Sequence, residues 1–378
     1  MLANYKEKGK DFFMKQDYLV LKNLEKIFGS GKESVTAVDK VNLEVKEGEL
    51  VTLLGPSGCG KTTALRMISG FELPTSGKIF IDGEDVTTTP PNQRPTTMVF
   101  QNYALFPHMT VYQNIAYGLK IHRIAEKVIR ERTEAIMDLV GLKGLNNRSP
   151  AQLSGGQQQR VSLARSLIME PKVLLLDEPL SNLDAKMRVS TRLEIRKIQQ
   201  RVGITSVYVT HDQEEAVTLS DRVVIMKAGQ IQQIGTPQEI YAHPVNYFVA
   251  DFIGKANFLE GKVVNILSQE EIEVDIKGVK HKVSIPKNTF SEGDRIFLVI
   301  RPESAELEPK KSGAINGIIS QVIYLGSRMV YEIKVEKNFL TVEITNPQEH
   351  KIYSIGEEVS VILKEKSLHV IPYEEIKK

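Results

Sequence analysis

The chain has 378 residues, a length that predicts two or three domains, each able to bury its own core. Its 49 Lys and Arg nearly balance 47 Asp and Glu, so the net charge does not indicate binding to nucleic acid or to an anionic membrane surface. The single cysteine, Cys59, excludes an internal disulfide, and the seven histidines lack metal-ligand spacing, so we expect no metal site built from protein ligands alone. No apolar run approaches the roughly 20 residues of a membrane-spanning helix, and the N-terminus lacks the apolar core of a signal peptide. We therefore expect a cytoplasmic protein whose spanning helices, if it acts at a membrane, belong to another subunit.

The first part of the chain alternates polar and β-rich segments. Residues 1–17 are predicted to form a loose polar arm, and strand-like segments begin at residue 18. The mostly apolar run 50–54 ends at a glycine, as expected of a buried strand that feeds a phosphate-binding loop. A helix from Thr62 to about Ser69 should follow, with its N-terminus toward the phosphates, because the helix dipole and free N–H groups favour anions there.

A mainly helical segment interrupts this pattern of strands and helices. Apolar side chains recur at an approximately helical period between residues 124 and 140, which predicts a helical insert over about 102–150. Further apolar runs, at 173–176, 206–209 and 223–226, are predicted to be buried strands. Strands that alternate with helical stretches favour a mostly parallel sheet with helices on its faces.

The C-terminal third differs from the rest of the chain in its predicted secondary structure, which consists mainly of short strands. Residues 236–254 are predicted to be a linker, with a helix-like stretch around 238–252. Many short strands separated by turns follow over 255–378 and predict a small β-barrel or sandwich. The predicted architecture is thus an α/β P-loop domain over residues 18–235, followed by an all-β domain that resembles an oligonucleotide-binding fold.

A glycine-rich loop carries the first chemical signal. Residues 55–63 fit the pattern G-x-x-x-x-G-K-[ST], in which backbone N–H groups cradle phosphates. Lys61 is predicted to reach the β- and γ-phosphates of ATP, and the Thr62 hydroxyl to bind Mg²⁺. We read Cys59 as a small side chain in the loop rather than as a nucleophile, because nothing in the sequence indicates an activating base. The predicted nucleotide-binding residues of this loop are Gly55, Pro56, Ser57, Gly58, Cys59, Gly60, Lys61, Thr62 and Thr63.

Two carboxylates close the apolar run that begins at residue 173. Hydrolysis of ATP needs charge neutralisation, a placed water and a group to orient that water. We expect the strand to deliver Asp177 toward the metal and to leave Glu178 to polarise the attacking water.

Three single residues complete the predicted set. Gln101 follows a strand-like segment, from which it can reach the metal or the water. His211 follows another strand and can hydrogen-bond the γ-phosphate. Phe28 lies upstream of the phosphate loop and is predicted to stack on adenine. Each also has a non-functional interpretation. An isolated Gln is commonly a surface residue, a His after a strand is commonly structural, and an aromatic residue such as Phe28 is often part of the core.

Taken together, the motifs resemble those of an ATP-binding-cassette ATPase. They stand in that family's order over about residues 18–235, in the segments 55–63, 101, 153–157, 176–179, 181–184 and 211. The resemblance implies that Ser154, Gly155, Gly156 and Gln157 form the family's signature motif, in which Ser154 and Gly156 contact a γ-phosphate held by a second copy of the chain. It also places Asp184 at that interface. Two ATP molecules are then sandwiched in a head-to-tail dimer that closes on ATP and opens after hydrolysis.

The tail resembles the C-terminal regulatory β-domain of solute-import ATPases, through residues 252–258 and 300–303. That group includes importers of polyamines, ferric ion, aminoethylphosphonate, sulfate and maltodextrins. The whole chain is thus similar to the ATPase subunit of a solute importer, and we take the polyamine type as the first expectation, with the other solutes as alternatives.

The resemblance also implies partners. The helical insert after Gln101 is expected to grip a membrane permease, which a separate extracytoplasmic solute-binding protein loads, and the chain is expected at the cytoplasmic face of the membrane. A rival hypothesis is a cassette ATPase that acts on nucleic acid or ribosomes through its β-domain. Residues 255–378 hold 18 Lys and Arg against 19 Asp and Glu, so we predict no nucleic-acid partner. A third hypothesis, compatible with import, makes the tail a sensor of a small molecule or protein that regulates hydrolysis.

Overall fold

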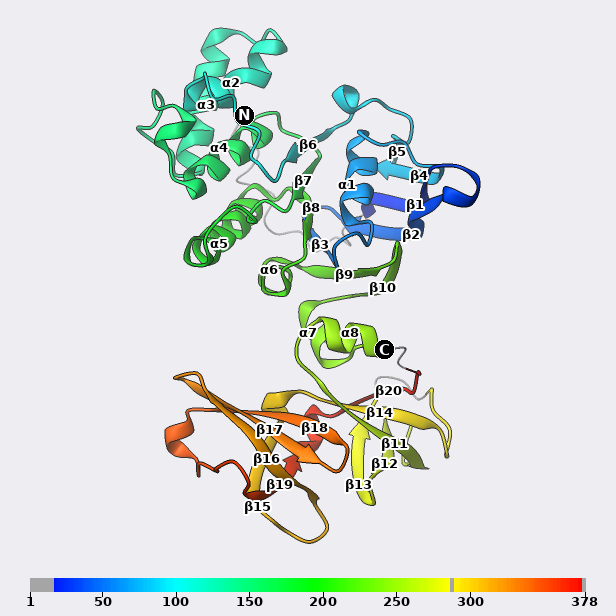
Figure 1. Cartoon of the computed structure of the whole chain (residues 1–378). Helices are drawn as coiled ribbons and strands as arrows, with labels where there is room; N and C mark the ends of the chain where they lie inside the picture. The colour runs from blue at the N-terminus through cyan, green and yellow to red at the C-terminus, as the bar shows by residue number, and fades with distance from the viewer. Residues whose placement is uncertain (1–16, 286–288, 376–378) are drawn as a thin grey trace. The chain divides into compact units, whose positions relative to one another are not determined.

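The computed structural model describes residues 17–285 and 289–375, and its contacts divide the chain into two units between Pro237 and Gln238 (Figure 1). The predicted polar arm lies outside the described residues except for Asp17, which begins strand β1. Each unit has its own hydrophobic core.

A six-stranded sheet of order β10-β9-β3-β8-β7-β6 organises the first unit. All neighbouring pairs are parallel except β9 and β10, which are antiparallel. Strands β3 and β8 are buried along their whole length, as expected where elements pack on both faces of a parallel sheet. The strands are β3 (Leu50–Leu54), β6 (Thr96–Val99), β7 (Val173–Asp177), β8 (Thr205–Thr210), β9 (Arg222–Lys227) and β10 (Gln230–Gly235).

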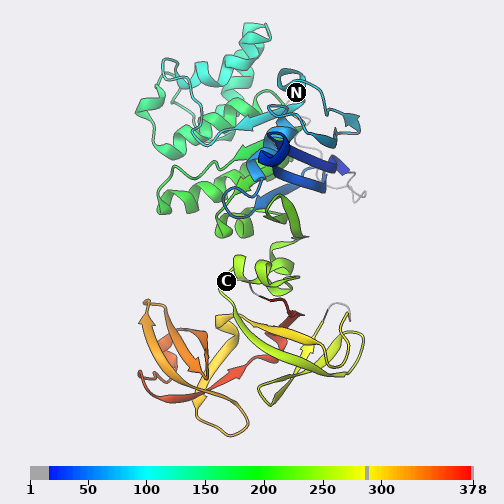
Figure 2. The same ribbon diagram turned by 45° about the vertical axis from the view of Figure 1, so that its right-hand side comes forward.

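The two faces of this sheet are covered differently, as both ribbon views show (Figures 1 and 2). Along β7, Leu174 and Leu176 belong to the core shared with helices α2 to α5, whereas Val173 and Leu175 face α1 and a second, antiparallel sheet. This alternation follows from the two-residue period of a strand. The second sheet has the order β2-β1-β4-β5 and consists of β1 (Asp17–Phe28), β2 (Val35–Lys46), β4 (Ser76–Ile81) and β5 (Glu84–Asp85).

The helices of the first unit have clear local start signals. Thr110 caps α2 through a reciprocal pair of hydrogen bonds with Gln113, and Asp184 caps α5 through the backbone N–H of Met187. The helices are α1 (Lys61–Ser69), α2 (Val111–Ile121), α3 (Glu126–Leu139), α4 (Gly155–Leu167), α5 (Ala185–Val202) and α6 (Gln213–Leu219), with 3₁₀ turns at Gly31–Glu33, Pro91–Gln93 and Pro150–Gln152.

The second unit is built from two five-stranded antiparallel sheets, of order β13-β12-β11-β14-β20 and β15-β19-β16-β17-β18. The strands are β11 (Asn257–Ile266), β12 (Glu271–Ile276), β13 (Val279–Ser284), β14 (Arg295–Ile300), β15 (Ala305–Pro309), β16 (Ile315–Tyr324), β17 (Arg328–Val335), β18 (Asn338–Thr345), β19 (Glu358–Leu363) and β20 (His369–Pro372), with 3₁₀ turns at Pro302–Ser304, Pro347–Glu349 and Glu365–Ser367. These sheets fit the predicted all-β domain.

The stretch around 238–252 differs from the single helix-like segment expected in a linker. It forms two short helices, α7 (Pro237–Ala242) and α8 (Tyr247–Phe252), and the Asn246 side chain starts the second by accepting from the N–H of Val249. The buried Arg301 guanidinium ties them to the sheets, donating to the carbonyls of Ala250 (2.8 Å) and Tyr241 (3.0 Å). The segment is therefore packed onto the β-domain, because a buried arginine needs these acceptors.

His369 makes the second unit sensitive to acid. Its ring is buried and donates from Nε2 to the carbonyl of Pro244 at 2.9 Å, and burial lowers its pKa to about 4. The unfolded chain binds a proton at the ordinary pKa near 6.5, so this contribution to stability is present above about pH 6.5 and is lost as the pH falls toward 4. The full loss is about 3 kcal/mol, from about 1.4 kcal/mol per pKa unit.

We therefore expect the free energy of unfolding of the second unit to fall between pH 6.5 and 4, and the variant His369→Gln to flatten that slope. Urea unfolding at several pH values, followed by circular dichroism, measures it. His350→Gln, at an exposed histidine of the same unit, is the matched control. Equal slopes in the wild type and His369→Gln would show that His369 is not responsible.

Candidate nucleotide site

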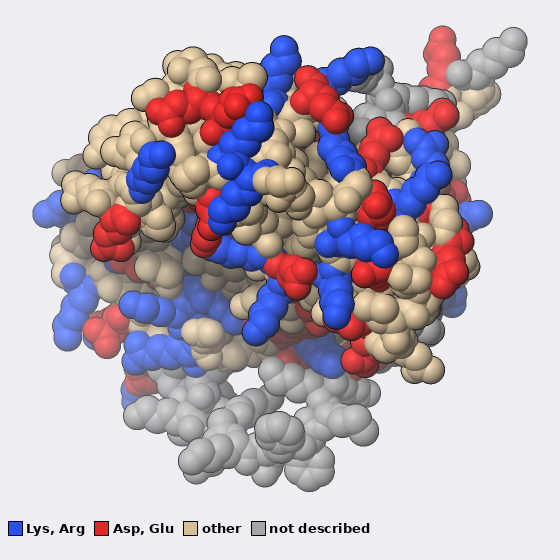
Figure 3. Space-filling view, turned by 90° about the horizontal axis from the view of Figure 1, so that it is seen from below, with Lys and Arg blue, Asp and Glu red and all other residues tan. Residues whose placement is uncertain are grey.

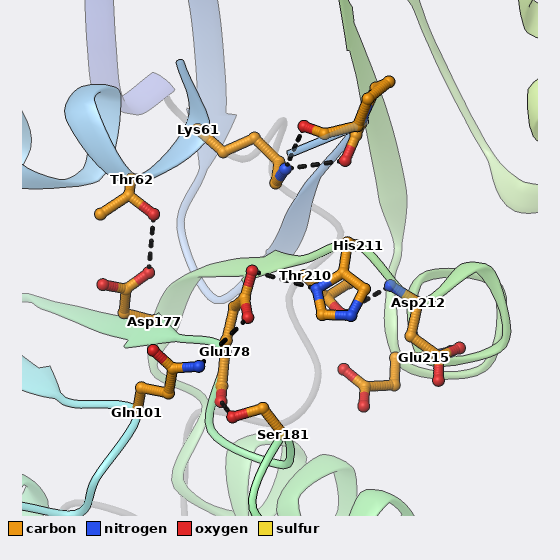
Figure 4. Close-up of polar contacts among 12 residues, drawn as sticks. Lys61, Thr62, Gln101, Asp177, Glu178, Ser181, Thr210, His211, Asp212 and Glu215 are labelled. Atoms are coloured by element: carbon orange, nitrogen blue, oxygen red, sulfur yellow. Dashed lines mark hydrogen bonds and ion pairs between the residues drawn. The ribbon is translucent and has the colours of Figure 1, made fainter. Parts of the chain in front are cut away.

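The phosphate loop runs from the end of β3 to the start of α1. Gly58 and Gly60 have φ of 79° and 102°, and a Cβ on Gly60 would lie 2.1 Å from the carbonyl oxygen of Ala37, so only glycine fits there. Lys61 is only 5% exposed, and its ammonium donates to the carbonyls of Gly55 (2.7 Å) and Pro56 (2.9 Å) (Figure 4). The loop carbonyls thus fix the ammonium of Lys61, which is predicted to contact the β- and γ-phosphates of ATP.

Two predicted metal ligands lie together next to this loop. The Thr62 hydroxyl at the start of α1 donates to Asp177 Oδ1 at the end of β7, over 3.1 Å. Burial is the main cause that raises the pKa of Asp177, and the hydrogen bond from Thr62 opposes it. No group of three or more His, Cys, Asp or Glu able to hold a metal occurs in the described ranges. A hydroxyl and one carboxylate suit Mg²⁺, which takes oxygen ligands and completes its shell from phosphates and water.

Two side chains from separate loops converge on Glu178. His211 Nδ1 lies 3.1 Å from Glu178 Oε1, and Gln101 Nε2 donates to Glu178 Oε2 at 3.5 Å (Figure 4). Glu178 has a left-handed backbone, with φ of 42°, and its N–H donates to the carbonyl of Val209. A non-glycine residue in this region costs of order 1 kcal/mol and such residues cluster at functional sites. The structure therefore brings together the three residues predicted to handle the attacking water and the γ-phosphate.

The predicted signature residues start helix α4. The Ser154 side chain accepts from the N–H of Gln157, and the Gln157 side chain accepts from the N–H of Ser154 at 3.0 Å. Ser154 is exposed, whereas Gly156 is buried, and a Cβ on Gly156 would lie 3.1 Å from Met187. The glycine therefore permits close packing of α4 on α5, and the helix start remains open to solvent.

The other predicted residues have structural roles that the sequence did not reveal. Asp184 caps α5, with its Oδ1 2.9 Å from the N–H of Met187. Phe28 ends β1, is 42% exposed, and has the ammonium of Lys26 4.9 Å from its ring centroid. The exposed ring at this place leaves surface on which adenine can stack.

Two polar residues of the site were missed from sequence. Asn182 Nδ2 donates to the carbonyl oxygen of Gln101 at 2.9 Å and so holds the backbone that carries this glutamine. Glu215 lies buried behind Glu178 and His211, at the wall of a small cavity. For Asn182 a signal existed, because it belongs to the run 181–184, whereas burial of Glu215 depends on tertiary packing.

A buried strand that feeds a glycine loop, with a carboxylate pair at the end of a second parallel strand of the same sheet, is the arrangement of a P-loop nucleotide hydrolase. The model of the ABC transporter family matches residues 38–181, and the model of the TOBE domain matches residues 298–371. Among residues 17–285 and 289–375, none of the helices combines the length and the apolar composition of a membrane-spanning segment.

Known proteins are similar over most of the chain. The chain is 46% identical over 356 residues to the Fe(3+) ions import ATP-binding protein FbpC 1 of Rhizobium meliloti, covering 93% of this chain and 97% of that protein. It is 48% identical over 324 residues to the spermidine/putrescine import ATP-binding protein PotA of Marinobacter nauticus, covering 85% and 86%. The solved dimeric structure of the ATP-binding cassette MJ0796, in a post-hydrolysis state bound to ADP and Pi, aligns with a TM-score of 0.51 at 32% identity, over 58% of this chain and 98% of that one.

The chain belongs to the ABC transporter family, as an ATP-binding subunit of the import type with a C-terminal TOBE domain. It is an ATPase coupled to transport. The predicted fold class, a P-loop ABC ATPase domain followed by an all-β domain, is confirmed.

Proposed function

We propose that this chain hydrolyses ATP with Mg²⁺ at a site shared by two copies and thereby powers the uptake of ferric ion through a membrane permease. The observation that carries the proposal is the convergence of three groups at the ends of parallel strands. These are the Lys61 loop, the Thr62–Asp177 pair and the Glu178 carboxylate with its two partners.

The chain's own residues divide the work of hydrolysis. Lys61 and the loop N–H groups bind the β- and γ-phosphates, and Glu178 polarises the attacking water while His211 and Gln101 hold the water and the γ-phosphate in place. Thr62, Asp177 and Gln101 would hold Mg²⁺, which supplies charge neutralisation at the phosphate oxygens when bound.

A second copy completes the site in this proposal. The exposed start of α4 offers the Ser154 hydroxyl and free backbone N–H groups, which suit a phosphate. The cassette MJ0796 is dimeric, which supports a dimer here. In that dimer Ser154 and Gly156 of one copy would lie against the γ-phosphate bound by the other, with Asp184 at the interface.

Ferric ion replaces the polyamine that we first expected. The Fe(3+) import relatives of Rhizobium meliloti and Brucella abortus align with 93% of the chain at 46% identity, whereas the relative named for spermidine and putrescine aligns with 85% at 48%. The alignments that cover more of the chain favour the ferric type.

The permease contact is assigned to the insert after Gln101. Phe106 and Tyr117 lie with ring centroids 4.6 Å apart, and the nearby Ile121 is 62% exposed. An apolar surface of this kind, joined through residues 101–106 to the nucleotide site, can pass a change at Gln101 to a permease at the cytoplasmic face of the membrane. A separate extracytoplasmic binding protein would deliver the solute.

The rival hypothesis of a nucleic-acid partner gains no support. On the face seen in Figure 3, Lys and Arg are interspersed with Asp and Glu, and no continuous basic stripe crosses it. A clustered basic patch or stripe is the usual electrostatic footprint of phosphate-backbone binding.

An uptake assay with labelled ferric ion tests the proposal. The cells carry the chain together with its permease and its binding protein. We expect uptake with the wild type and with Glu214→Gln, an exposed control, and none with Glu178→Gln. Labelled spermidine is measured in parallel. Spermidine uptake that depends on Glu178, without ferric uptake, would restore the polyamine assignment. If Glu178→Gln reduces the uptake of neither solute, the import role is contradicted.

A further inference from the structure

A small cavity of about 70 Å³ lies next to Glu178 and His211. One water needs about 10–15 Å³ of such volume, so the cavity has room for several waters. Its walls are polar and consist of Glu178, Ser181, Arg188, Thr210, His211, Asp212 and Glu215. Polar walls of this kind hold ordered water rather than an empty void.

Glu215 contributes a buried carboxylate to this cavity. It lies in the first turn of α6, which Asp212 caps by accepting from the N–H of Glu215 at 3.1 Å. Glu215 is 3% exposed, whereas the side chain of its neighbour Glu214 is 80% exposed. The hydroxyl of the fully buried Tyr208 donates to Glu215 Oε2 at 2.9 Å. Figure 4 shows the carboxylate directed away from α6, toward the loop that carries Glu178 and Ser181.

The surroundings of Glu215 allow it to bind and release a proton. Burial, the largest cause, raises the pKa of Glu215, and the charge of Asp212 adds to this. Hydrogen bonds from Thr210 and Tyr208 and the charge of Arg192 on α5 act in the opposite direction. The other charged or titratable groups at the cavity are Glu178, Arg188 and His211.

We propose that Glu215 receives, through water in this cavity, the proton that the attacking water loses during ATP hydrolysis. This rests on the proposed function, because it assumes that Glu178 polarises the attacking water. As the new P–O bond forms, the bond between the γ-phosphorus and the bridging oxygen breaks, and its electron pair leaves with ADP. The proton of the attacking water passes to cavity water, and cavity water gives a proton to the Glu215 carboxylate. Glu215 returns the proton to solvent before the next turnover.

The dependence of kcat on pH tests this role. We expect Glu215→Gln to lower kcat roughly tenfold, less than the 10²–10⁴ of direct general-base catalysis, and to remove the acid limb of the profile. The Kd for ATP should stay within about twofold, because Glu215 lies behind the site rather than against the phosphates. Glu214→Gln, one position away on the same helix, is the matched control and should keep the wild-type profile.

A second variant tests the role while keeping the carboxylate. Tyr208→Phe removes a hydrogen bond that favours the charged form of Glu215, so the pKa of Glu215 should rise and the acid limb should move to higher pH. The maximal kcat should remain near that of the wild type. A purely structural role for the pair would change the amount of folded protein without moving the limb.

The outcomes separate the two proposals. If Glu178→Gln hydrolyses ATP as the wild type does, the proposed function fails. If Glu178→Gln is inactive but the Glu215→Gln profile matches that of Glu214→Gln, or Tyr208→Phe leaves the acid limb in place, the role of Glu215 alone is overturned. Should Glu215→Gln fail to fold, the shift with Tyr208→Phe decides the question.

Discussion

Replacing Glu178 by Gln is expected to lower kcat for ATP hydrolysis by about 10³-fold while leaving the Kd for ATP within about threefold. The amide keeps the shape of the side chain and can still meet His211 and Gln101, but it lacks the negative charge that polarises the attacking water. Steady-state phosphate release and equilibrium binding of labelled ATP measure the two quantities.

Glu214→Gln removes a carboxylate of the same kind from an exposed position in the same unit and serves as the control. Its kcat should be that of the wild type. A Glu178→Gln chain that hydrolyses ATP at more than about a tenth of the wild-type rate would assign the polarisation of water to another residue.

Replacing Lys61 by Ala is expected to weaken ATP binding about 100-fold and to make hydrolysis undetectable. The ammonium now lies against the carbonyls of Gly55 and Pro56, inside the loop that receives the phosphates, and no other cation of the loop can replace it. Equilibrium binding of labelled ATP in the presence of Mg²⁺ measures the loss.

Lys172→Ala is the matched control, because this lysine is paired with Asp82 on the surface of the same unit. Its removal should change ATP affinity by less than about twofold. Native affinity in the Lys61→Ala chain would mean that the nucleotide binds elsewhere.

The parts of the site that local sequence dictates were predictable. A mostly apolar, buried strand that ends in a glycine loop and a helix start is a local pattern, and so is the pair of carboxylates at the end of β7. Parallel strands then bring their carboxyl ends to one edge of the sheet, which explains why Lys61, Asp177 and His211 meet.

Other parts depend on packing that no local pattern reveals. Glu214 and Glu215 are adjacent and chemically identical, yet only Glu215 is buried, because it shares a helix face with Leu219. The break between α7 and α8 has local signals in Pro244 and in the Asn246 cap, whereas the packing of both helices depends on Arg301, which is distant in sequence. The transported solute could not be predicted from the motifs either, because the ATPase subunit need not contact the solute.

ATP retained by the Glu178→Gln chain after rapid gel filtration tests most directly whether ATP is held between two copies. We expect about one ATP per chain to be retained, because binding without hydrolysis keeps the two copies closed. Adding Ser154→Arg, which places a bulky side chain where the partner's phosphate should lie, should lower retention about tenfold or more, whereas Thr88→Arg at an exposed loop position should not. Retention that is unchanged by Ser154→Arg would contradict a site shared between two copies.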